Sequence, residues 1–388
     1  MDFERFTIDD LRARNGFKWR RYGDDVIPAW VADMDFPVAE PIQAYVTGAA
    51  MRSDFGYPSK HEAEGLAAIF AARMAAKYGW QIPVERTVLL TDIVQGLYWG
   101  VLGTCGEADS AIIQTPIYPP FLRSVKETGR RPILCPLVMD EERFEIDFDA
   151  MERAIDTRTR VFMLCNPHNP GGRAFTRAEL ERLGEWVLQH DLVVLADEIH
   201  SDLVYAGHAH IPFGSLAPEL MRRTITFNSA NKAFNIAGLR VGLAVFGSAE
   251  LMQAFSPYPE RVRGGLSSFA CAASRIAWQS CDDWLTAAVA YLQANRDYMT
   301  NFLAERLPSV KYCPPEATYL AWLDFTQSGL GAEPLDFFLA HAKVALYDGT
   351  AFGPQGVGCT RINFATPRYI LHEILARMAA AVAQHAGG

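Results

Sequence analysis

One lysine stands alone among small and apolar residues, directly after a strand-like run. Lys232 lies in the stretch "FNSANKAFNIAGLR" and is the only charged residue between Ile225 and Leu239. An amine kept from water has a lowered pKa, and the neutral amine is a nucleophile that forms Schiff bases with carbonyl compounds. The alternative is a solvated or snorkelling lysine with no chemical role.

Two other groups of polar residues also follow strand-like runs. Asp197, Glu198 and His200 come directly after "LVVLA", where acidic residues either cap a helix or serve as a functional acid. The loop "NPHNPGGR", residues 166–173, follows "RVFMLC", and its Pro and Gly residues predict a sharp turn. Taken singly, each group allows a purely structural interpretation.

The order of these groups along the chain favours one shared chemical site. An asparagine loop, a strand-end acid, a strand-end lysine and then Arg240 are the groups that a pyridoxal phosphate site requires. Lys232 would bond the aldehyde, and Asp197 would keep the pyridine nitrogen protonated so that the ring withdraws electrons. Asparagine would donate to the phenolic oxygen, while Arg240 and N–H groups at a helix start would hold the phosphate.

The elements that would position these groups alternate between strand-like and helix-like stretches. The strand-like runs are mostly continuous apolar stretches, which is typical of strands buried on both faces of a largely parallel sheet. Their alternation with helices such as the one from Thr176 predicts an α/β layered domain, with functional loops at the carboxyl ends of the strands. The runs are "RTVLL", "SAIIQ", "RVFMLC", "LVVLAD", "TITFN" and "RVGLAVF".

The C-terminal part of the chain has a different pattern. A long helix-like stretch, "DDWLTAAVAYLQANRDYMTNFLAERL", precedes a few short strand-like runs and a final helix, which predicts a smaller α+β domain. We expect residues 46–285 to form the large domain and residues 286–388 the small one. Residues 1–45 are too few and too charged to fold alone, so we expect them to pack on the small domain.

Composition narrows the class of protein. The net charge of −9 argues against nucleic acid or an anionic membrane as partner. The charged N-terminus resembles no signal peptide, and no apolar run approaches the ~18 residues of a membrane span. The seven cysteines are scattered, without metal-ligand spacing, as in reduced cytoplasmic proteins. We therefore expect a cytoplasmic protein without a metal site.

Eight segments, in chain order, resemble a known family. The chain resembles the fold-type I pyridoxal phosphate enzymes of the class I/II aminotransferase superfamily and, more narrowly, the MalY/PatB family of cystathionine β-lyases, or C–S lyases. The resemblance spans nearly the whole chain and implies an aspartate aminotransferase-like large domain. The segments are "PAWVADMDFP", "FGYPS", "TPIYPPF", "NPHNPGGR", "ADEIHSDLVY", "NKAFNIAGLR", "EATYLAWLDF" and "FGPQGVGCTRINFATPR".

The resemblance implies roles for residues around the cofactor ring. Lys232 would be the Schiff-base lysine and would move the Cα proton of the substrate. Asp197 would pair with the pyridinium nitrogen, and Asn169 would bond the phenolic oxygen. Tyr118 would stack on the ring face, although plain core packing is the alternative for this aromatic residue. His200 would lie beside the ring, where its alternative is a hydrogen-bonded supporting residue.

The resemblance also implies a phosphate site that two subunits share. Ser229, Arg240 and the backbone N–H groups of Val94 and Gln95 would hold the phosphate. Tyr57 would reach the phosphate of the neighbouring subunit, which implies a homodimer with shared active sites. Two positions depart from the family pattern: Asp92 brings a negative charge into the phosphate turn, and Asn231 replaces a more usual Ser before the lysine.

Substrate contacts follow from the same resemblance. Arg361 would clamp the α-carboxylate of an amino acid, and the turn containing Trp30 and Ala32 would lie over the substrate. The implied reaction is α,β-elimination of an L-cysteine thioether, such as L-cystathionine, to a thiol, pyruvate and ammonia. Alternatives are an aminotransferase, or a family member that acts on a bulky cysteine S-conjugate or another amino-acid bond in secondary metabolism. A binding protein that reuses this scaffold would have lost the lysine or the acid, and both are present.

Overall fold

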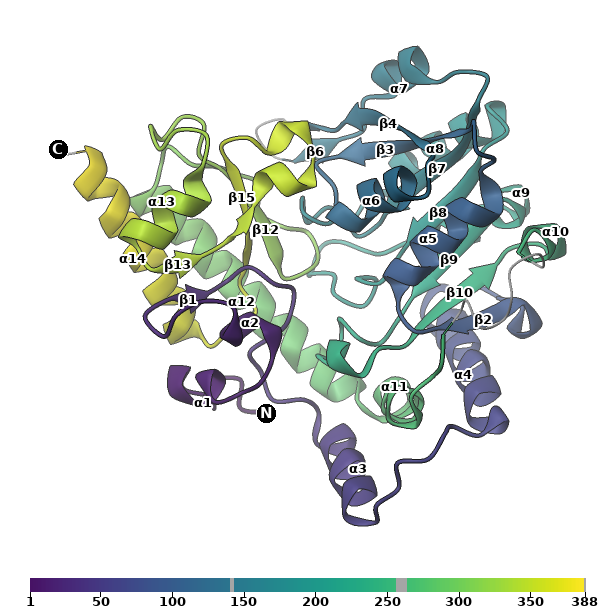
Figure 1. Cartoon of the computed structure of the whole chain (residues 1–388), viewed down its shortest axis with the longest axis horizontal. Coiled ribbons are helices and arrows are strands. Elements are labelled where there is room, and N and C mark those ends of the chain that lie inside the picture. The colour runs from purple at the N-terminus through teal and green to yellow at the C-terminus, as the bar shows by residue number, and fades with distance from the viewer. Residues whose placement is uncertain (140–142, 256–263, 387–388) are drawn as a thin grey trace.

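A seven-stranded sheet forms the centre of the chain (Figure 1). The computed structural model describes residues 1–139, 143–255 and 264–386. All neighbouring strands pair in parallel except β10, which is antiparallel to both of its neighbours. In spatial order the strands are β2 (Thr87–Leu90), β10 (Gly242–Phe246), β9 (Thr224–Asn228), β8 (Val193–Asp197), β7 (Thr159–Cys165), β3 (Ser110–Thr115) and β4 (Arg131–Pro136).

Apolar clusters cover both faces of this sheet. Leu195 of β8 packs in one cluster, whereas its neighbours Val194 and Ala196 pack in another, because successive strand residues point to opposite faces. This two-sided burial is why the strands read as continuous apolar runs, and the expected α/β fold with a mostly parallel sheet is confirmed. The covering helices are α5 (Ile93–Thr104), α6 (Pro119–Glu127), α7 (Phe148–Ala154), α8 (Arg177–Gln189), α9 (Pro218–Arg222) and α10 (Ala249–Gln253).

The apolar runs of the sequence mark six of the seven strands of this sheet, and β4 is the strand that they do not mark. This strand contains Pro132 and Pro136 and is only partly buried. Proline cannot donate to a sheet hydrogen bond, so it is tolerated at the edge position that β4 occupies. An edge strand with prolines lacks the apolar pattern by which the inner strands were recognised.

A smaller antiparallel sheet of four strands lies toward the C-terminus. Its spatial order is β11 (Lys311–Tyr312), β12 (Leu320–Asp324), β15 (Cys359–Asn363) and β14 (Tyr347–Asp348). The helices nearby in the chain are α12 (Asp282–Arg306), α13 (Pro334–His341) and α14 (Arg368–Ala386), with the short 3-10 turns η5 (Gly349–Phe352) and η6 (Pro354–Gly356).

The N-terminal segment lies against this C-terminal part (Figure 1). Strand β1 (Ile27–Pro28) pairs in parallel with β13 (Val344–Ala345), more than 300 residues later. The helices α1 (Ile8–Arg12) and α2 (Phe17–Arg20) precede β1. Helix α4 (Lys60–Tyr78) packs beside β2 at the edge of the large sheet, and α11 (Ser268–Ser280) packs against both α4 and α3 (Glu40–Met51). The proposed boundaries at residues 45 and 285 stay predictions, and residues 387 and 388 of the last region lie outside the described residues.

The described ranges contain neither a membrane-spanning helix nor a metal-binding cluster. No helix there has the length and apolar character needed to cross a membrane. No group of three or more His, Cys, Asp or Glu side chains there is arranged to hold a metal ion. All seven cysteines are buried and outside any disulfide bond.

Candidate active site

A pocket of about 580 Å³ opens where β7, β8 and β9 end. Cys165 and Asp197 are the last residues of neighbouring strands and lie opposite each other in the pairing, so the loops that follow begin side by side. The pocket brings together eight of the residues that the sequence predicted: Ala32, Val94, Tyr118, Asn169, Asp197, His200, Lys232 and Arg240. Residues far apart in the chain therefore meet at the carboxyl edge of the sheet, as expected for this fold class.

Lys232 points its amine at a backbone carbonyl of the N-terminal segment. Its Nζ donates a hydrogen bond of 2.8 Å to the oxygen of Ala32. Burial lowers the pKa of Lys232 and the positive charge of Arg361 lowers it further, while Asp33 and Asp197 oppose the shift. Such an amine is more readily neutral than a lysine on the surface, which suits a nucleophile or a base.

Asp197 is a buried carboxyl at the end of β8. It is 5% exposed, and its Oδ1 accepts a hydrogen bond of 3.0 Å from the Ile199 N–H. Burial raises the pKa of Asp197 to about 7, although the Ile199 N–H and the Lys232 charge both favour the ionised form. A cationic N–H donor placed in this pocket would form an ion pair with the carboxylate and stabilise its charge. A protonated pyridine nitrogen is such a donor.

Asn169 and Arg361 are held together by a buried hydrogen bond. The Nη1 of Arg361 donates to the Oδ1 of Asn169 at 3.0 Å, and its Nη2 donates to the Trp30 oxygen at 2.8 Å. The Nε of Arg361 is buried and has no hydrogen-bond partner in the described part of the chain. Burial lowers the pKa of Arg361 to about 10, so the group stays cationic at neutral pH with a free donor edge.

The loop that carries Asn169 is anchored at its far end. Arg173 is 1% exposed and pairs with Glu316 at 2.9 Å and with Glu179 at 2.8 Å. Glu179 lies in α8 and Glu316 precedes β12, so the loop is tied to both parts of the protein. Since the oxygen of the Asn169 amide faces Arg361, its NH₂ group is the one left to donate to a ring oxygen.

His200 is a neutral imidazole beside the pocket. It is 2% exposed, and burial lowers its pKa to about 3, with Lys232 and Arg361 acting in the same direction. Its Nδ1 is buried and lacks a hydrogen-bond partner among the described residues. Tyr118, the residue before α6, lines the same pocket and is joined to the asparagine loop by a backbone hydrogen bond to Asn169.

At the other end of the pocket, Asp92 engages two of the predicted phosphate-binding groups. Arg240 forms an ion pair with Asp92, whose Oδ1 also accepts a 2.8 Å hydrogen bond from the Gln95 N–H as the N-cap of α5. A phosphate held by Arg240 and the Gln95 N–H therefore competes with this carboxylate. Val94 lines the pocket next to them, after the first residue of α5.

Ser229 and Asn231 fasten the loop that carries Lys232 to the backbone oxygen of Val241. The Ser229 hydroxyl donates to the Val241 oxygen at 2.6 Å and accepts the Asn231 N–H at 3.1 Å. The Asn231 side chain donates to the same Val241 oxygen at 3.1 Å. The two departures from the family pattern, Asp92 and Asn231, leave Lys232, Asp197 and Asn169 in the pocket. The role of Ser229 in binding phosphate stays a prediction.

Five predicted residues do not line the pocket: Gln95, Ser229 and Arg361, described above, and Trp30 and Tyr57. Trp30 contributes its carbonyl oxygen to Arg361, while its ring packs against Phe17 at 4.8 Å. Tyr57 is fully exposed in the single chain, so its predicted contact needs a second subunit.

Sequence reasoning missed residues that fasten the N-terminal segment over Lys232. The Tyr319 hydroxyl donates to the Ala32 oxygen at 2.9 Å. Asn235 accepts from the Met34 N–H at 3.1 Å and donates to the Phe36 oxygen at 2.9 Å. Asn235 has a positive φ of 57°, a conformation that asparagine tolerates better than most residues. Its residue type could therefore have predicted a turn at this place in the lysine loop.

Comparisons with known proteins agree with this geometry. The sequence profile described as "Aminotransferase class I and II" matches residues 33–377. The chain is 35% identical to cystathionine β-lyase PatB of Bacillus subtilis, over 94% of this chain and 96% of the relative. It is 31% identical to the cystathionine β-lyase of Corynebacterium glutamicum, over 96% and 98% of the two chains.

A solved structure gives the same result. The pyridoxal phosphate-bound C–S lyase of Staphylococcus hominis is 30% identical and superposes with a TM-score of 0.91, over 99% of each chain. The buried Asp197 carboxyl, the shielded Lys232 amine and the free amide donor of Asn169 fit this cofactor. The chain is therefore a pyridoxal phosphate-dependent enzyme of the class I and II aminotransferase family, related to the PatB-type cystathionine β-lyases.

Proposed function

We propose that the enzyme cleaves the C–S bond of an L-cysteine thioether such as L-cystathionine. The observation that carries the proposal is that one pocket holds the buried amine of Lys232, the buried carboxyl of Asp197 and Asn169, whose amide oxygen accepts a hydrogen bond from Arg361. Pyridoxal phosphate, when bound, withdraws electrons from the substrate Cα and so makes its proton acidic. The relatives named above as C–S lyases and cystathionine β-lyases support the choice of reaction.

Arg361 has the geometry for the α-carboxylate of the substrate. Its guanidinium packs against the rings of Tyr347 and Phe352, at 4.8 and 5.1 Å from their centroids. Its Nε is unpaired among the described residues, and each Nη group has a second N–H besides the one already bonded, so Nε and an Nη can together donate to a carboxylate. Binding there orients the Cα–H bond relative to the amine of Lys232.

Lys232 acts as the base that removes the Cα proton. Its lowered pKa favours the neutral form, and its hydrogen bond to Ala32 holds the amine on the substrate side of the pocket. Loss of the proton and departure of the sulfur from Cβ release a thiol. Water then completes the reaction, so each thioether consumed gives one thiol, one pyruvate and one ammonium ion.

The test is a panel of cysteine thioethers with and without an added oxo acid. A C–S lyase makes pyruvate and free thiol without an oxo acid, in equal amounts. An aminotransferase, the competing proposal, produces neither in quantity until an oxo acid accepts the amino group. Absence of both products from every thioether would overturn the proposal.

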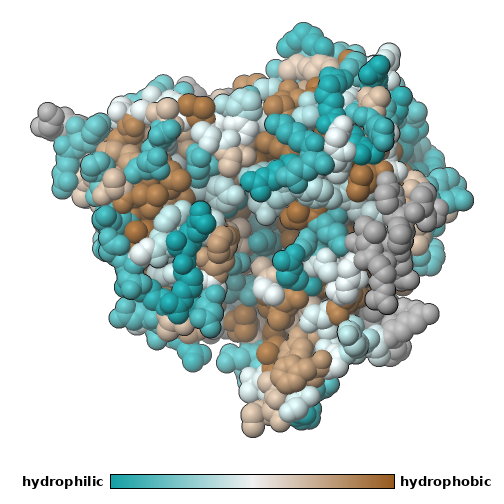
Figure 2. Space-filling model, viewed as in Figure 1, coloured by the Kyte–Doolittle hydropathy of each residue, from teal (hydrophilic) through white to brown (hydrophobic). Residues whose placement is uncertain are grey.

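The proposed assembly is a homodimer with shared sites. Hydrophobic residues gather on the surface over α3, at the lower edge of Figure 2. At the end of α3 and just beyond it, Met51, Phe55 and Tyr57 are 84%, 69% and 100% exposed. Large apolar groups exposed together mark interaction surfaces, and this one includes the tyrosine predicted to reach the neighbouring phosphate. Light scattering of the purified enzyme tests the assembly, and a monomer would contradict it.

A further inference from the structure

A second cavity adjoins the lysine pocket on the side of the N-terminal segment. It has a volume of about 450 Å³ and shares Gly16, Asp33, Ala237 and Gly238 with the wall of the lysine pocket. The two spaces therefore adjoin at these four residues, and a long substituent on the substrate sulfur would reach the second space past Asp33. We call it the distal cavity.

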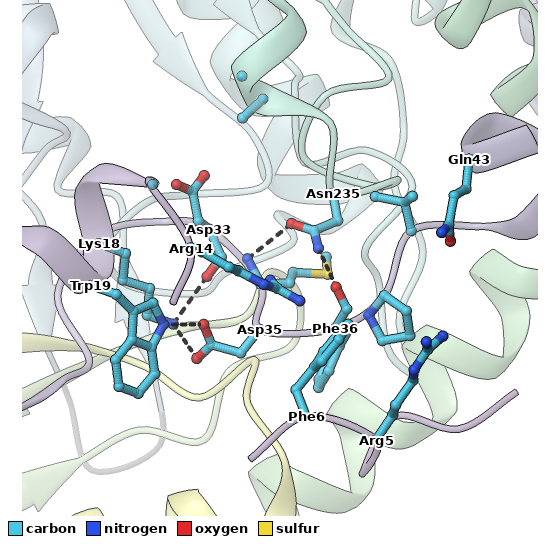
Figure 3. A pocket seen from close by; sticks show the side chains of 16 residues that line it. Arg5, Phe6, Arg14, Lys18, Trp19, Asp33, Asp35, Phe36, Gln43 and Asn235 are labelled. Atoms are coloured by element: carbon cyan, nitrogen blue, oxygen red, sulfur yellow. Dashed lines mark hydrogen bonds and ion pairs between the residues drawn. The ribbon is translucent and has the colours of Figure 1, made fainter. Parts of the chain in front are cut away.

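Arg14 places a cation in the distal cavity (Figure 3). Its guanidinium lies between Asp35 and Asn235 in this view and packs over the Phe6 ring at 4.1 Å. Over the described ranges, no carboxylate lies within ion-pair distance of Arg14. A partly buried guanidinium that no carboxylate pairs with directly retains binding capacity for an anion.

The acid in the cavity that acts most on Arg14 is already engaged. Asp35 accepts from the Lys18 Nζ at 2.6 Å and from the Trp19 Nε1 at 2.7 Å. Lys18 and Asp35 are both buried and neutralise each other. Burial lowers the pKa of Arg14, and the negative charges of Asp35 and Asp10 offset this only in part. The positive charge of Arg14 is therefore left for a group that enters the cavity.

The wall between the two spaces is held rigid from both sides. Asn235, three residues after Lys232, bonds the backbone of Met34 and Phe36. The Ala32 oxygen in the same segment accepts from both Lys232 and Tyr319. This fixes the position of the distal cavity relative to the reacting amine, as a specificity site requires.

We propose that Arg14 binds a carboxylate at the far end of the group carried by the substrate sulfur. This inference rests on the proposed C–S lyase function and names its substrate class: L-cysteine thioethers whose S-substituent ends in a carboxylate. Where that end is a whole amino acid, as in L-cystathionine, Asp33, which lines both spaces, would be the acid available to its ammonium group. Arg14 thus determines specificity and takes no part in breaking bonds.

The test compares two substrates of the same shape. S-(3-carboxypropyl)-L-cysteine carries the distal carboxylate, and its amide, S-(3-carbamoylpropyl)-L-cysteine, lacks the charge. Pyruvate release by the holoenzyme is measured for wild type, Arg14→Gln and the control Arg21→Gln, which alters an exposed arginine after α2. We expect Arg14→Gln to lower kcat/KM for the acid by about 10- to 100-fold, mainly through KM, with less than about a threefold change for the amide.

Each other outcome has a distinct meaning. Equal losses for acid and amide, or an equal loss in Arg21→Gln, would overturn the role of Arg14 in charge recognition. An unchanged preference for the acid in Arg14→Gln would also overturn it. If wild type releases pyruvate from neither compound nor from any other thioether, the proposed function itself fails. The kcat/KM for the amide substrate shows whether each variant is folded and loaded with cofactor.

Discussion

The amine of Lys232 and the carbonyl oxygen of Ala32 are 2.8 Å apart although 200 residues separate them in the chain. The N-terminal segment therefore forms part of the pocket that holds the reactive amine. Tyr319 donates to the same oxygen from the C-terminal part, so one backbone carbonyl joins three distant regions of the sequence.

Substituting Lys232 should abolish both the cofactor bond and the reaction. Wild type should stay yellow on dialysis because Lys232 bonds the cofactor, and we expect Lys232→Ala to lose this colour. We also expect the variant to form pyruvate about 10²- to 10⁴-fold more slowly, because it lacks the base that removes the Cα proton. Visible absorbance and a pyruvate assay measure the two effects. Lys126→Ala, at an exposed site in α6, is the control, and substantial turnover by Lys232→Ala would contradict the assignment.

Asp197 should make the cofactor-free protein less stable as the pH rises. Its folded-state pKa of about 7 lies above the ~3.9 of an unfolded aspartate, so the folded state holds the extra proton between these values. The free energy of unfolding then falls with rising pH across that window, by up to about 4 kcal/mol from this group. Urea unfolding of the apoenzyme at several pH values should show this fall.

The matched variant isolates the contribution of Asp197. Asp197→Asn cannot titrate, so its apoenzyme should lack this part of the fall between about pH 4 and pH 7. Asp336→Asn, at an exposed position in α13, should keep the wild-type profile. Identical profiles for wild type and Asp197→Asn would show that Asp197 is ionised in the folded apoenzyme across the whole window.

Sequence patterns located the inner strands and the loops at their ends, because both depend on local signals. Apolar runs mark β7, β8 and β9, and the polar residues that follow them must meet at one edge of a parallel sheet. The distal cavity has no such signal. Arg14 lies in a charged stretch that is indistinguishable from a solvated surface, and only the packing of residues 5–43 around Asn235 places it beside the site.

The pairing of Arg240 with Asp92 was likewise beyond sequence analysis. The sequence showed that Asp92 adds negative charge, but 148 residues separate the two groups, and only the pairing of β2 with β10 brings their ends together. Which partner an exposed arginine selects depends on side-chain rotamers that no local pattern specifies.

Removing the negative charge at Asp92 should strengthen cofactor binding. Asn caps a helix about as well as Asp, so Asp92→Asn preserves the start of α5 while freeing Arg240 for the phosphate. We expect the dissociation constant of pyridoxal phosphate to fall by about 3- to 30-fold, as for one close charge near a surface. Fluorescence titration of the apoenzyme with pyridoxal phosphate measures this dissociation constant. Asp297→Asn, remote from the pocket, is the control, and weaker binding by Asp92→Asn would contradict the competition.

The buried pair of Lys18 and Asp35 should control the docking of the N-terminal segment. The two side chains are about 4% and 3% exposed, and the Lys18 amine also donates to the Asp33 oxygen at 3.2 Å. Lys18→Met leaves a buried carboxylate with Trp19 as its remaining side-chain donor, and breaking such a pair costs about 3–5 kcal/mol. Urea unfolding should show a loss of this size.

A second substitution separates lost charge pairing from lost packing. In Lys18→Met with Asp35→Leu no charge is left unpaired, so the double variant should recover most of the stability that the single variant lost. Lys126→Met tests the effect of removing an exposed lysine and should change the free energy of unfolding by less than about 0.5 kcal/mol. If the double variant is less stable than Lys18→Met, packing around Lys18 and Trp19, rather than the buried charge, holds the segment in place.

Because Asp33 and Arg14 are carried by this same segment, Lys18→Met should also reduce the preference for carboxylate-bearing thioethers. The kcat/KM values for the acid and amide pair measure this preference.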